Sequence, residues 1–443
     1  MLSRLLKSNL VWLLLSIGGG QFIRLLGNLV LTRLLVPEMF GLMALVNSFI
    51  MGLAMFSDVG IRGSIINNSN SHKAEFYNTA WTLQIIRGGL LYFIVLIFAF
   101  PLSKFYDIEQ LPALLAVAGS VALLHGLMPT KMFWQMKELN LRRLSMIEIG
   151  SQVLGMFFLI GLSWYFRSVW ALVFGSLITV MIALLMNSTL IPGACNRLHW
   201  NKQYFHEIFR YGRWILLSSG SMFLILQGDR LVMGKYFSLE LLGIYSIAIN
   251  FSMLINDTGE KVASKYLFPH YRKIVERGPE AIHRIRGFRN KGMLLGTLGC
   301  LPLMLGGQWL VEFLYKDNYH DAGWMLQILT LSAIFRLLDT TLRPLFLANA
   351  NSFDSMVYQI IKAVIYMGSM ILLVDYLGIE GLILAIVLAP LLNLVVLHIM
   401  MKKYGFKWHF DDVPFILFVL AIAYLGWSFM GVNPLELMSK FSA

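Results

Sequence analysis

The sequence predicts an all-α polytopic membrane protein: two six-helix bundles that repeat in parallel, plus one extra C-terminal transmembrane helix. Three observations predict this fold class. Apolar residues come in blocks of about 20, the length at which a helix crosses the hydrocarbon layer. The chain is 58% hydrophobic and 14% charged, whereas a soluble domain is about a quarter charged. A stretch near the N-terminus also recurs in the second half of the chain.

The spans follow one another in a regular order. All are expected to be helices, because lipid offers no hydrogen-bond partner to backbone amides. Residues 1–195 are expected to form the N-terminal bundle, residues 196–211 a cytoplasmic linker and residues 212–403 the C-terminal bundle. Residues 404–443 supply a basic loop, a thirteenth span and a short tail. The expected spans are residues 10–35, 40–58, 80–101, 111–132, 146–166, 168–191, 212–236, 240–260, 292–315, 323–348, 355–376, 379–401 and 413–431.

Lysine and arginine outside the spans are distributed unevenly. If the N-terminus is cytoplasmic, 24 of these residues fall on the inner side and 5 on the outer side. The connection 261–291 is the most basic inner segment, and the outer loops are as short as VPEMFG and DYLGIEG. This positive-inside asymmetry predicts a cytoplasmic N-terminus. The C-terminal tail would lie outside if the thirteenth span crosses the membrane.

An internal repeat relates the two halves. Residues 21–51 align without gaps on residues 223–253, at a constant shift of 202 residues. Apolar residues of two spans often match by chance, so the main support for the repeat comes from the matches of Glu38 with Glu240 and of Gly41 with Gly243. Six spans lie between the copies, and both halves therefore point the same way. Parallel repeats of this kind are typical of transporters whose substrate sites lie between the halves.

Basic residues inside the spans are the main functional signal. Each costs about 2.5–3.5 kcal/mol at a helix centre unless it meets water, protein or a ligand. Several lie on polar stripes at helical spacing, and one such stripe consists of Arg336, Asp339 and Arg343. The sequence therefore predicts a hydrated, basic cavity between the halves. The basic residues in spans are Arg24, Arg33, Arg87, Arg230, Arg336, Arg343 and Lys362.

Other roles are open for some of these residues. Arg33 and Lys362 lie near span ends, where a long side chain can reach the interface. Arg343 precedes Pro344 and would also suit the end of a broken helix. Asp229 is adjacent to Arg230, and neighbours on a helix do not face each other, so Asp229 is expected to pair with a basic residue of another span.

Guanidinium groups favour phosphate as the ligand of such a cavity, because they bind it through paired hydrogen bonds. A pyrophosphate-linked sugar suits a basic cavity better than a cationic drug does. No metal, other cofactor or nucleic acid is expected. The candidate substrate-binding residues are Arg24, Asn28, Arg87, Asp229, Arg230, Arg336, Asp339, Arg343 and Lys362.

Two stretches, RLLVPEMFGLMALVNSF and GDRLVMGKYFSLELLGIYSIAINF, resemble the polysaccharide-transport branch of the multidrug/oligosaccharidyl-lipid/polysaccharide (MOP) superfamily. The resemblance covers about residues 1–405. Most members have an even number of spans, so thirteen would be a departure. The matching positions, most of which suit a tight outer turn, are Arg33, Pro37, Gly41, Asp229, Arg230, Gly243 and Tyr245.

The resemblance implies a MOP-type fold in the bacterial inner membrane that alternates access between its two sides. It implies a flippase that moves undecaprenyl-pyrophosphate-linked oligosaccharide from the cytoplasmic to the periplasmic leaflet. A polysaccharide polymerase and a chain-length regulator would be its partners. Asp229 and Asp339 are candidate titrating groups for ion coupling, although a salt-bridge role is favoured for both.

Two other functions compete with the flippase. An ion-coupled multidrug exporter of the same superfamily would favour carboxylates inside the membrane, and the first span has none. A membrane polymerase or ligase would need a sizeable external loop for its catalytic groups, and every outer loop is short. The sequence therefore predicts a transporter and not an enzyme.

Overall fold

The computed structural model describes the chain as two compact units. One unit comprises Met1–Phe223 and the other Leu224–Ala443. The described residues are 9–57, 60–68, 73–138, 140–193, 195–263, 267–275, 282–349, 351–404 and 412–431. The predicted N-terminal and C-terminal tails lie outside these residues, as do residues 276–281 and 405–411 of the basic connections.

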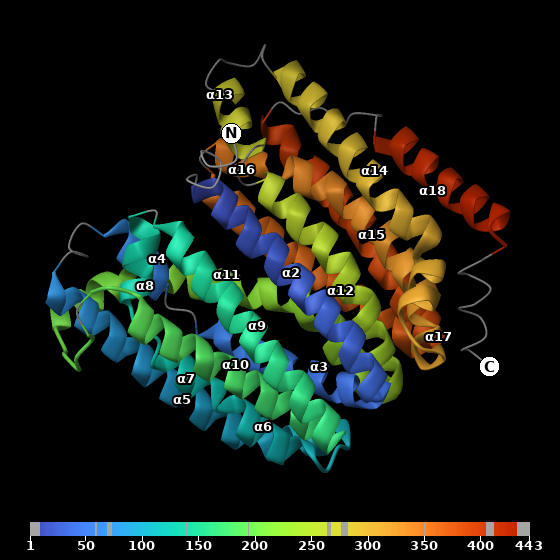
Figure 1. Ribbon diagram of the computed structural model, residues 1–443. Helices are drawn as coiled ribbons and strands as arrows, with labels where there is room; N and C mark the ends of the chain where they lie inside the picture. Colours follow the sequence, from blue (N-terminus) through green and yellow to red (C-terminus); the bar gives the residue numbers. More distant parts are fainter. Residues whose placement is uncertain are drawn as a thin grey trace, which may run out of the picture. The chain divides into compact units, whose positions relative to one another are not determined.

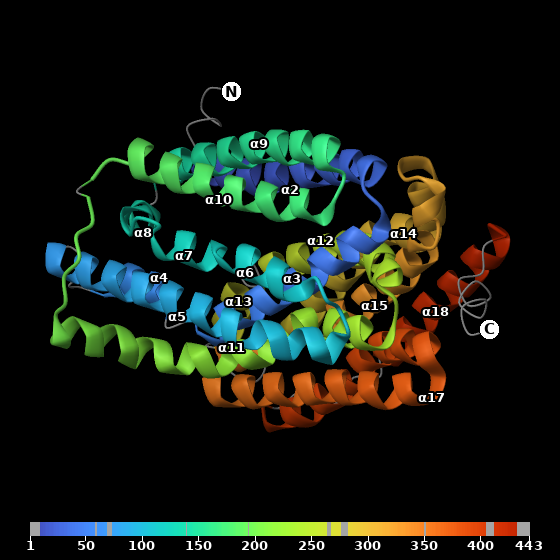
Figure 2. The ribbon, with the colours of Figure 1, turned by 90° about the horizontal axis from the view of Figure 1, so that it is seen from below.

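The N-terminal unit is built from helices α2 to α10 and the first part of α11 (Figure 1). Helix α9 packs between α2 and α10, and the three run side by side in Figure 2. Helix α5 packs against α6 and α7. The bounds are α2 Asn9–Leu34, α3 Pro37–Phe56, α4 Ile61–Asn67, α5 Ala74–Tyr106, α6 Leu111–Gly119, α7 Val121–Gly126, α8 Lys131–Lys137, α9 Leu141–Phe166, α10 Val169–Leu190 and α11 Lys202–Tyr236.

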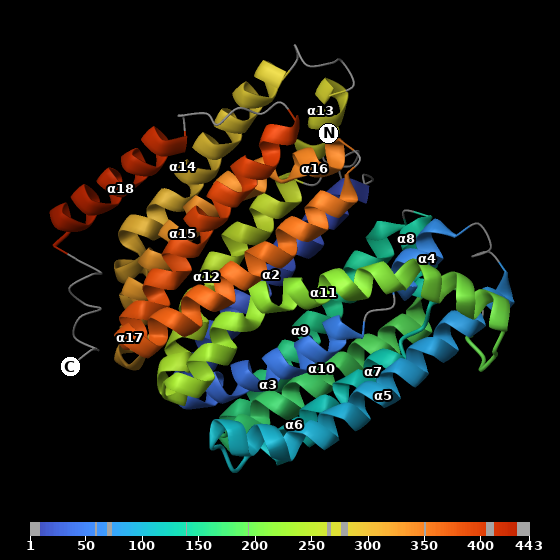
Figure 3. The same ribbon diagram turned by 180° about the vertical axis from the view of Figure 1, so that it is seen from behind.

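The C-terminal unit is arranged around one buried helix, α15. Helices α12, α14 and α17 all pack against it, and α15 and α17 lie alongside each other in Figure 3. The bounds are α12 Leu239–Val262, α13 Phe268–Val275, α14 Ile282–Leu314, α15 Ala322–Leu342, α16 Pro344–Ala348, α17 Ser352–Met401 and α18 Asp412–Phe429, with short 3-10 helices at Asp317–Tyr319 and Lys402–Tyr404.

The bounds of two helix pairs follow the sequence repeat. Helix α2 ends at Leu34 and α3 begins at Pro37, while α11 ends at Tyr236 and α12 begins at Leu239. Each pair of equivalent positions is separated by the same 202 residues as the aligned sequences. Pro37 can open a helix because the first backbone amides of a helix have no internal partner. In the second copy, the Ser238 hydroxyl caps α12 by accepting from the Leu241 amide at 3.2 Å.

Helix α17 contains both the eleventh and the twelfth predicted spans. Gly378 separates its two parts with φ 56° and ψ −133°, a conformation that only glycine adopts without strain. Both parts reach α15: Lys362 before the break bonds Asp339, and the carbonyl of Ile386 after it accepts from the Ser332 hydroxyl. The chain therefore turns back at Gly378, as the short predicted loop DYLGIEG requires.

The membrane-spanning character of the chain is confirmed. Among the described residues, eight helices are long and apolar enough to cross a membrane, or nine if the bent pair Leu111–Gly126 and Lys131–Lys137 is one span. This number is below thirteen partly because α17 counts once although it holds two predicted spans.

The structure differs locally from the sequence prediction at two places. The predicted span 111–132 is broken, because Pro129 disfavours a helical conformation in the residue before it, and α8 continues at a 61° angle. In the predicted linker 196–211, the residues from Lys202 onwards already belong to α11.

Helix α18 lies at the position of the thirteenth predicted span and is joined to its unit by a buried ionic contact. Nη1 and Nη2 of Arg289 lie 2.6 and 2.8 Å from the two carboxylate oxygens of Asp412. Nε2 of His398 lies 3.0 Å from Oδ2 of the same carboxylate. Along its length, α18 packs Val419, Ala423 and other apolar side chains onto α14 and α15. The helix is therefore an integral part of the C-terminal unit.

Candidate functional site

Most of the predicted site residues come together in the C-terminal unit. They lie on α11, α12, α15 and α17, and we refer to them with their hydrogen-bond partners as the polar cluster. Helical spacing places Arg336 and Asp339 of α15, with Arg343 directly after it, on one face. The first part of α17 presents Tyr358, Lys362 and Tyr366 to them at intervals of about one turn. The members of the polar cluster are Gln227, Asp229, Arg230, Tyr245, Met253, Glu260, Arg336, Asp339, Arg343, Tyr358, Lys362 and Tyr366.

Asp339 lies at the centre of the contact between α15 and α17. It is only 2% exposed. The Lys362 ammonium donates to Oδ2 at 2.5 Å, and the Tyr358 hydroxyl donates to Oδ1. A buried carboxylate is tolerated when it is both paired and hydrogen-bonded. The favoured salt-bridge role of Asp339 therefore agrees with the geometry, and Lys362 is paired inside the protein instead of extending to the interface.

Arg343 forms the second ion pair of the polar cluster. It follows the last residue of α15, and α16 begins at Pro344, so the predicted helix break is present. Its guanidinium bonds the carboxylate of Glu260 on α12. The Glu260 side chain is 44% exposed, so this pair contributes less to stability than a buried one would.

Asp229 is buried and has a neutral partner. Its carboxylate accepts from the Tyr245 hydroxyl and from the backbone amide of Arg230, the latter at 2.9 Å. The expectation that Asp229 pairs with a basic residue of another span is therefore wrong. The physical reason is that two hydrogen-bond donors satisfy the carboxylate without a second charge. Spacing alone did not indicate Tyr245 as the partner, although Tyr245 was among the positions that match the family.

The guanidinium of Arg230 has no carboxylate partner among the described residues. Nη1 donates to Oε1 of Gln227 at 2.7 Å, and Nη2 lies 3.8 Å from the sulfur of Met253. Nε is buried and has no hydrogen-bond partner in this part of the chain. The guanidinium is therefore held in place by neutral groups and retains donors for an anion.

Arg336 is the second such arginine. Within the described chain it also lacks a carboxylate partner: Nη2 lies 3.5 Å from the Tyr366 hydroxyl, and its guanidinium lies 5.7 Å from the centre of that ring. Every other residue of α15 is buried, and Arg336 alone is partly exposed. The most buried helix of the unit therefore presents one cation at its surface.

The charges of the polar cluster nearly cancel. Four basic side chains accompany three carboxylates, which leaves a formal excess of one positive charge. Instead of a broadly basic site, the polar cluster contains two guanidinium groups without a carboxylate partner among the described residues, those of Arg230 and Arg336. Gln227 and Tyr358 were not singled out by the sequence, although each stands about one helical turn from a residue that was.

The three predicted residues of the N-terminal unit do not form a comparable cluster. Arg87 on α5 donates to the Ala54 carbonyl at 2.7 Å and to the Ser57 hydroxyl at 2.9 Å. It thereby binds the carbonyl end of α3, where a cation is favourable, which is an architectural role. Arg24 is exposed and Asn28 half-buried on α2, and their place in a cavity stays a prediction.

A metal site is not indicated by the described side chains. No group of three or more His, Cys, Asp or Glu residues in that part of the chain could hold an ion. Cys195 and Cys300 are both free thiols.

The sequence model of one family, described as "Polysaccharide biosynthesis protein", matches residues 30–322. The chain belongs to this family. This family agrees with the resemblance to proteins of polysaccharide transport that the two quoted stretches indicated. The described residues form helices and no strands, so the predicted all-α fold is confirmed.

Two characterised relatives illustrate the match. The Escherichia coli (strain K12) "Lipopolysaccharide biosynthesis protein WzxC" is 24% identical over 84% of this chain and 76% of its own. The Rhizobium meliloti (strain 1021) "Succinoglycan biosynthesis transport protein ExoT" is 21% identical over 73% of this chain and 65% of its own.

Solved structures agree on the fold. The lipid II flippase MurJ in an inward closed conformation gives a TM-score of 0.69, with 10% identity, over 93% of this chain and 91% of MurJ. An inward-facing multidrug resistance transporter of the MATE family gives 0.68, with 15% identity, over 90% of this chain and 98% of its own. At such low identity these structures establish the fold and not the substrate.

Proposed function

We propose that the protein flips undecaprenyl-pyrophosphate-linked oligosaccharide repeat units from the cytoplasmic to the periplasmic leaflet, for the synthesis of a surface polysaccharide. The names of its relatives support this choice: they serve lipopolysaccharide biosynthesis and succinoglycan transport. A flippase for a lipid-linked precursor, MurJ, shares the fold. The location that fits this function is the bacterial inner membrane, with the N-terminus in the cytoplasm, as the positive-inside asymmetry favours.

The observation that carries the proposal is the pair of arginines without carboxylate partners among the described residues. Arg230 and Arg336 are held by neutral groups, while Lys362 and Arg343 are neutralised by Asp339 and Glu260. Guanidinium groups with free donors bind phosphate oxygens in a fork geometry. We assign the two arginines to the pyrophosphate and the two ion pairs to the framework that positions them.

Alternating access is part of the proposal, and the shared fold supports it. MATE family transporters of this fold have been solved in inward-facing and in outward-facing conformations. Substrate release would require that the phosphate contacts weaken in one of the two states, since a ligand shifts an equilibrium only by its differential affinity. A polysaccharide polymerase and a chain-length regulator are the partners that would use the exported units.

The test is a flipping assay with purified protein in vesicles. We expect that vesicles with the wild-type protein translocate a glycan-linked undecaprenyl pyrophosphate, and that Arg336→Ala and Arg230→Ala each lose most of this activity. Arg62→Ala, which removes an exposed charge on α4, serves as the matched control and should retain it. Insertion and abundance of each variant are measured in the same samples.

The same assay separates the flippase from the multidrug exporter. Vesicles that export cationic dyes and ignore glycan-lipids would reject the flippase and favour the exporter. Cationic substrates would be repelled by Arg230 and Arg336, so we expect the dyes to be ignored.

A further inference from the structure

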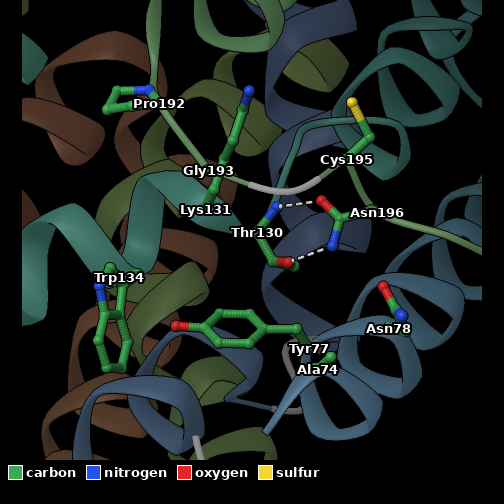
Figure 4. Close-up of a pocket in the computed structure, with 10 residues that line it drawn as sticks. All are labelled: Ala74, Tyr77, Asn78, Thr130, Lys131, Trp134, Pro192, Gly193, Cys195 and Asn196. Carbon is green, nitrogen blue, oxygen red and sulfur yellow. Dashed lines mark hydrogen bonds between the residues drawn. The ribbon is translucent and has the colours of Figure 1, made fainter. Parts of the chain in front are cut away.

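A pocket in the N-terminal unit lies apart from the polar cluster. It is formed by the first turn of α5, by α8 and by the loop that follows α10 (Figure 4). Its volume is about 280 Å³, near the lower end of the roughly 300–1,000 Å³ of small-molecule sites. The pocket is thus large enough for one ring-sized ligand and too small for an oligosaccharide.

One wall of the pocket is aromatic. Tyr77 and Trp134 meet edge to face, with ring centres 5.9 Å apart and an angle of 71° between the rings. The Tyr77 hydroxyl is buried and has no hydrogen-bond partner among the described residues, and in Figure 4 it points towards Trp134. A buried hydroxyl without a partner costs free energy, so this group is suited to a ligand that completes its hydrogen bond.

The opposite wall is polar and held in place by hydrogen bonds. Oδ1 of Asn196 accepts from the Thr130 amide at 3.1 Å, while its Nδ2 donates to the Thr130 hydroxyl at 2.7 Å. Oδ1 of Asn78 accepts from the backbone amide of Arg197 at 3.0 Å, which directs its Nδ2 donors elsewhere. Gly193, at φ 133°, allows the loop to turn beside Lys131. These hydrogen bonds fix the side chains of Asn196 and Asn78 within the lining.

The lining of the pocket carries a positive charge. Lys131 is the one charged side chain among the lining residues that the structure describes, and none of these is acidic. Its ammonium donates to the carbonyl of Ser188 at 2.7 Å, and Lys137 stands 5.7 Å from the Trp134 ring centre. An aromatic cage for a quaternary ammonium would not carry two lysines, so the ligand is neutral or anionic.

We propose that this pocket binds one pyranose ring, so that the protein reads a sugar of its cargo at the cytoplasmic face before transport. The apolar face of a pyranose stacks on aromatic rings, and its hydroxyls match the Tyr77 phenol and the Asn78 amide. Lys131 would add affinity for an acidic sugar. The pocket lies at the ends of spans that the positive-inside asymmetry places in the cytoplasm. This role rests on the proposed function, because the sugar is taken to belong to the lipid-linked substrate.

The chain contains its own reporter for the test. Of its two cysteines, Cys195 is exposed and lines the pocket, while Cys300 is buried. The rate at which N-ethylmaleimide alkylates Cys195 in the full-length purified protein therefore measures pocket occupancy. Methyl glycosides of glucose, galactose, N-acetylglucosamine, rhamnose and glucuronic acid are the ligands to add, with glycerol phosphate as the lipid-headgroup mimic. The alkylation signal should be lost in Cys195→Ser, which assigns it to this cysteine.

We expect at least one glycoside to slow the alkylation of Cys195. In Trp134→Ala, the concentration needed for protection should rise about tenfold, the loss expected for one aromatic contact. Tyr77→Phe removes a hydroxyl that has no partner among the described residues, so it should weaken protection without lowering the melting temperature. Trp164→Ala, which changes an exposed tryptophan on α9, is the control and should leave protection intact.

Three results would overturn the proposal. These are the absence of protection by every glycoside, protection that is unchanged in both Trp134→Ala and Tyr77→Phe, and protection by glycerol phosphate alone, which would assign the pocket to a lipid headgroup. Alkylation does not depend on translocation. Protection by a glycoside in a protein that fails to flip glycan-lipids would therefore reject the proposed function and retain the pocket.

Discussion

At the scale of single residues, the charges of the C-terminal unit divide into those that form ion pairs within the fold and those that we propose bind a ligand. The pair of Asp339 and Lys362 belongs to the first group, because the carboxylate is buried and the ammonium is 14% exposed. Breaking a buried pair leaves one charge without compensation. Stability is therefore the property that this pair should control.

Lys362→Met should lower the free energy of unfolding by about 3–5 kcal/mol, since it leaves the buried Asp339 carboxylate with the Tyr358 hydroxyl alone. The double variant Lys362→Met with Asp339→Asn should recover part of this loss. Unfolding of the purified protein in detergent measures both. Glu260→Gln, in the more exposed pair with Arg343, should cost about 1 kcal/mol or less. A double variant no more stable than the single one would contradict the paired role.

At this scale the sequence predicted the polar stripe of one helix but not every partner on a neighbouring helix. The polar stripe of Arg336, Asp339 and Arg343 was visible from spacing, and the structure places all three in one polar cluster. The partner of Asp229 was missed, because a tyrosine hydroxyl on another helix carries no charge that a pattern would reveal. Pairing between helices depends on packing, which a single sequence does not encode in its spacing.

At the scale of elements, the turn inside α17 depends on one glycine. Gly378 has φ 56° and ψ −133°, and a side chain there would be strained although no atom lies close to it. Gly378→Ala should lower stability by about 1–3 kcal/mol. Gly368→Ala is the matched control: it lies within the helix with open space around its Cβ, so alanine should be neutral or stabilising by up to about 1 kcal/mol. Equal melting temperatures for the two variants would refute the role of Gly378.

Helix α18 depends on the ionic contact at its first residue. Asp412 is 1% exposed and receives a bidentate contact from Arg289. Nε2 of His398 lies 3.0 Å from the same carboxylate, and its Nδ1 lies 2.9 Å from the Leu394 carbonyl oxygen.

Asp412→Asn should cost about 3–5 kcal/mol, because it leaves the buried Arg289 guanidinium opposite a neutral amide. Limited proteolysis between α17 and α18 should become faster, together with a lower melting temperature. Wild-type behaviour in both measurements would show that apolar packing alone holds α18.

Elements were more predictable than residues. Apolar blocks and charge asymmetry depend only on composition along the chain, and each predicted span has a helix at its place among the described residues. The break near Pro129 and the early start of α11 at Lys202 were missed. The hydrophobicity of successive residues does not reveal a bend inside an apolar run, nor a helix that begins in a polar segment.

At the scale of the whole molecule, the charges and the spans together predict how the chain is oriented in the membrane. With a cytoplasmic N-terminus and thirteen spans, the C-terminus is expected in the periplasm. Alkaline phosphatase fused after residue 431 should therefore be active in cells, and the same enzyme inserted after residue 404 should be inactive. Activity at both positions or at neither would show that α18 does not cross the membrane.

The repeat is the other feature of the whole molecule that the sequence revealed. Its constant shift predicted that the outer turns at residues 35–36 and 237–238 are equivalent, and the helix bounds on either side agree residue by residue. A cavity shared by the two halves stays a prediction, because a repeat relates the halves without specifying what lies between them.

The central claim is that Arg230 and Arg336 bind the anionic group of the substrate. The most direct test is the dissociation constant of a glycan-linked undecaprenyl pyrophosphate for the purified wild-type protein and for Arg336→Ala, Arg336→Lys and Arg62→Ala. We predict that Arg336→Ala weakens binding about tenfold or more, the worth of one charge-assisted hydrogen bond, with a smaller loss in Arg336→Lys and none in Arg62→Ala. Equal affinities of the wild-type protein and Arg336→Ala would contradict the account.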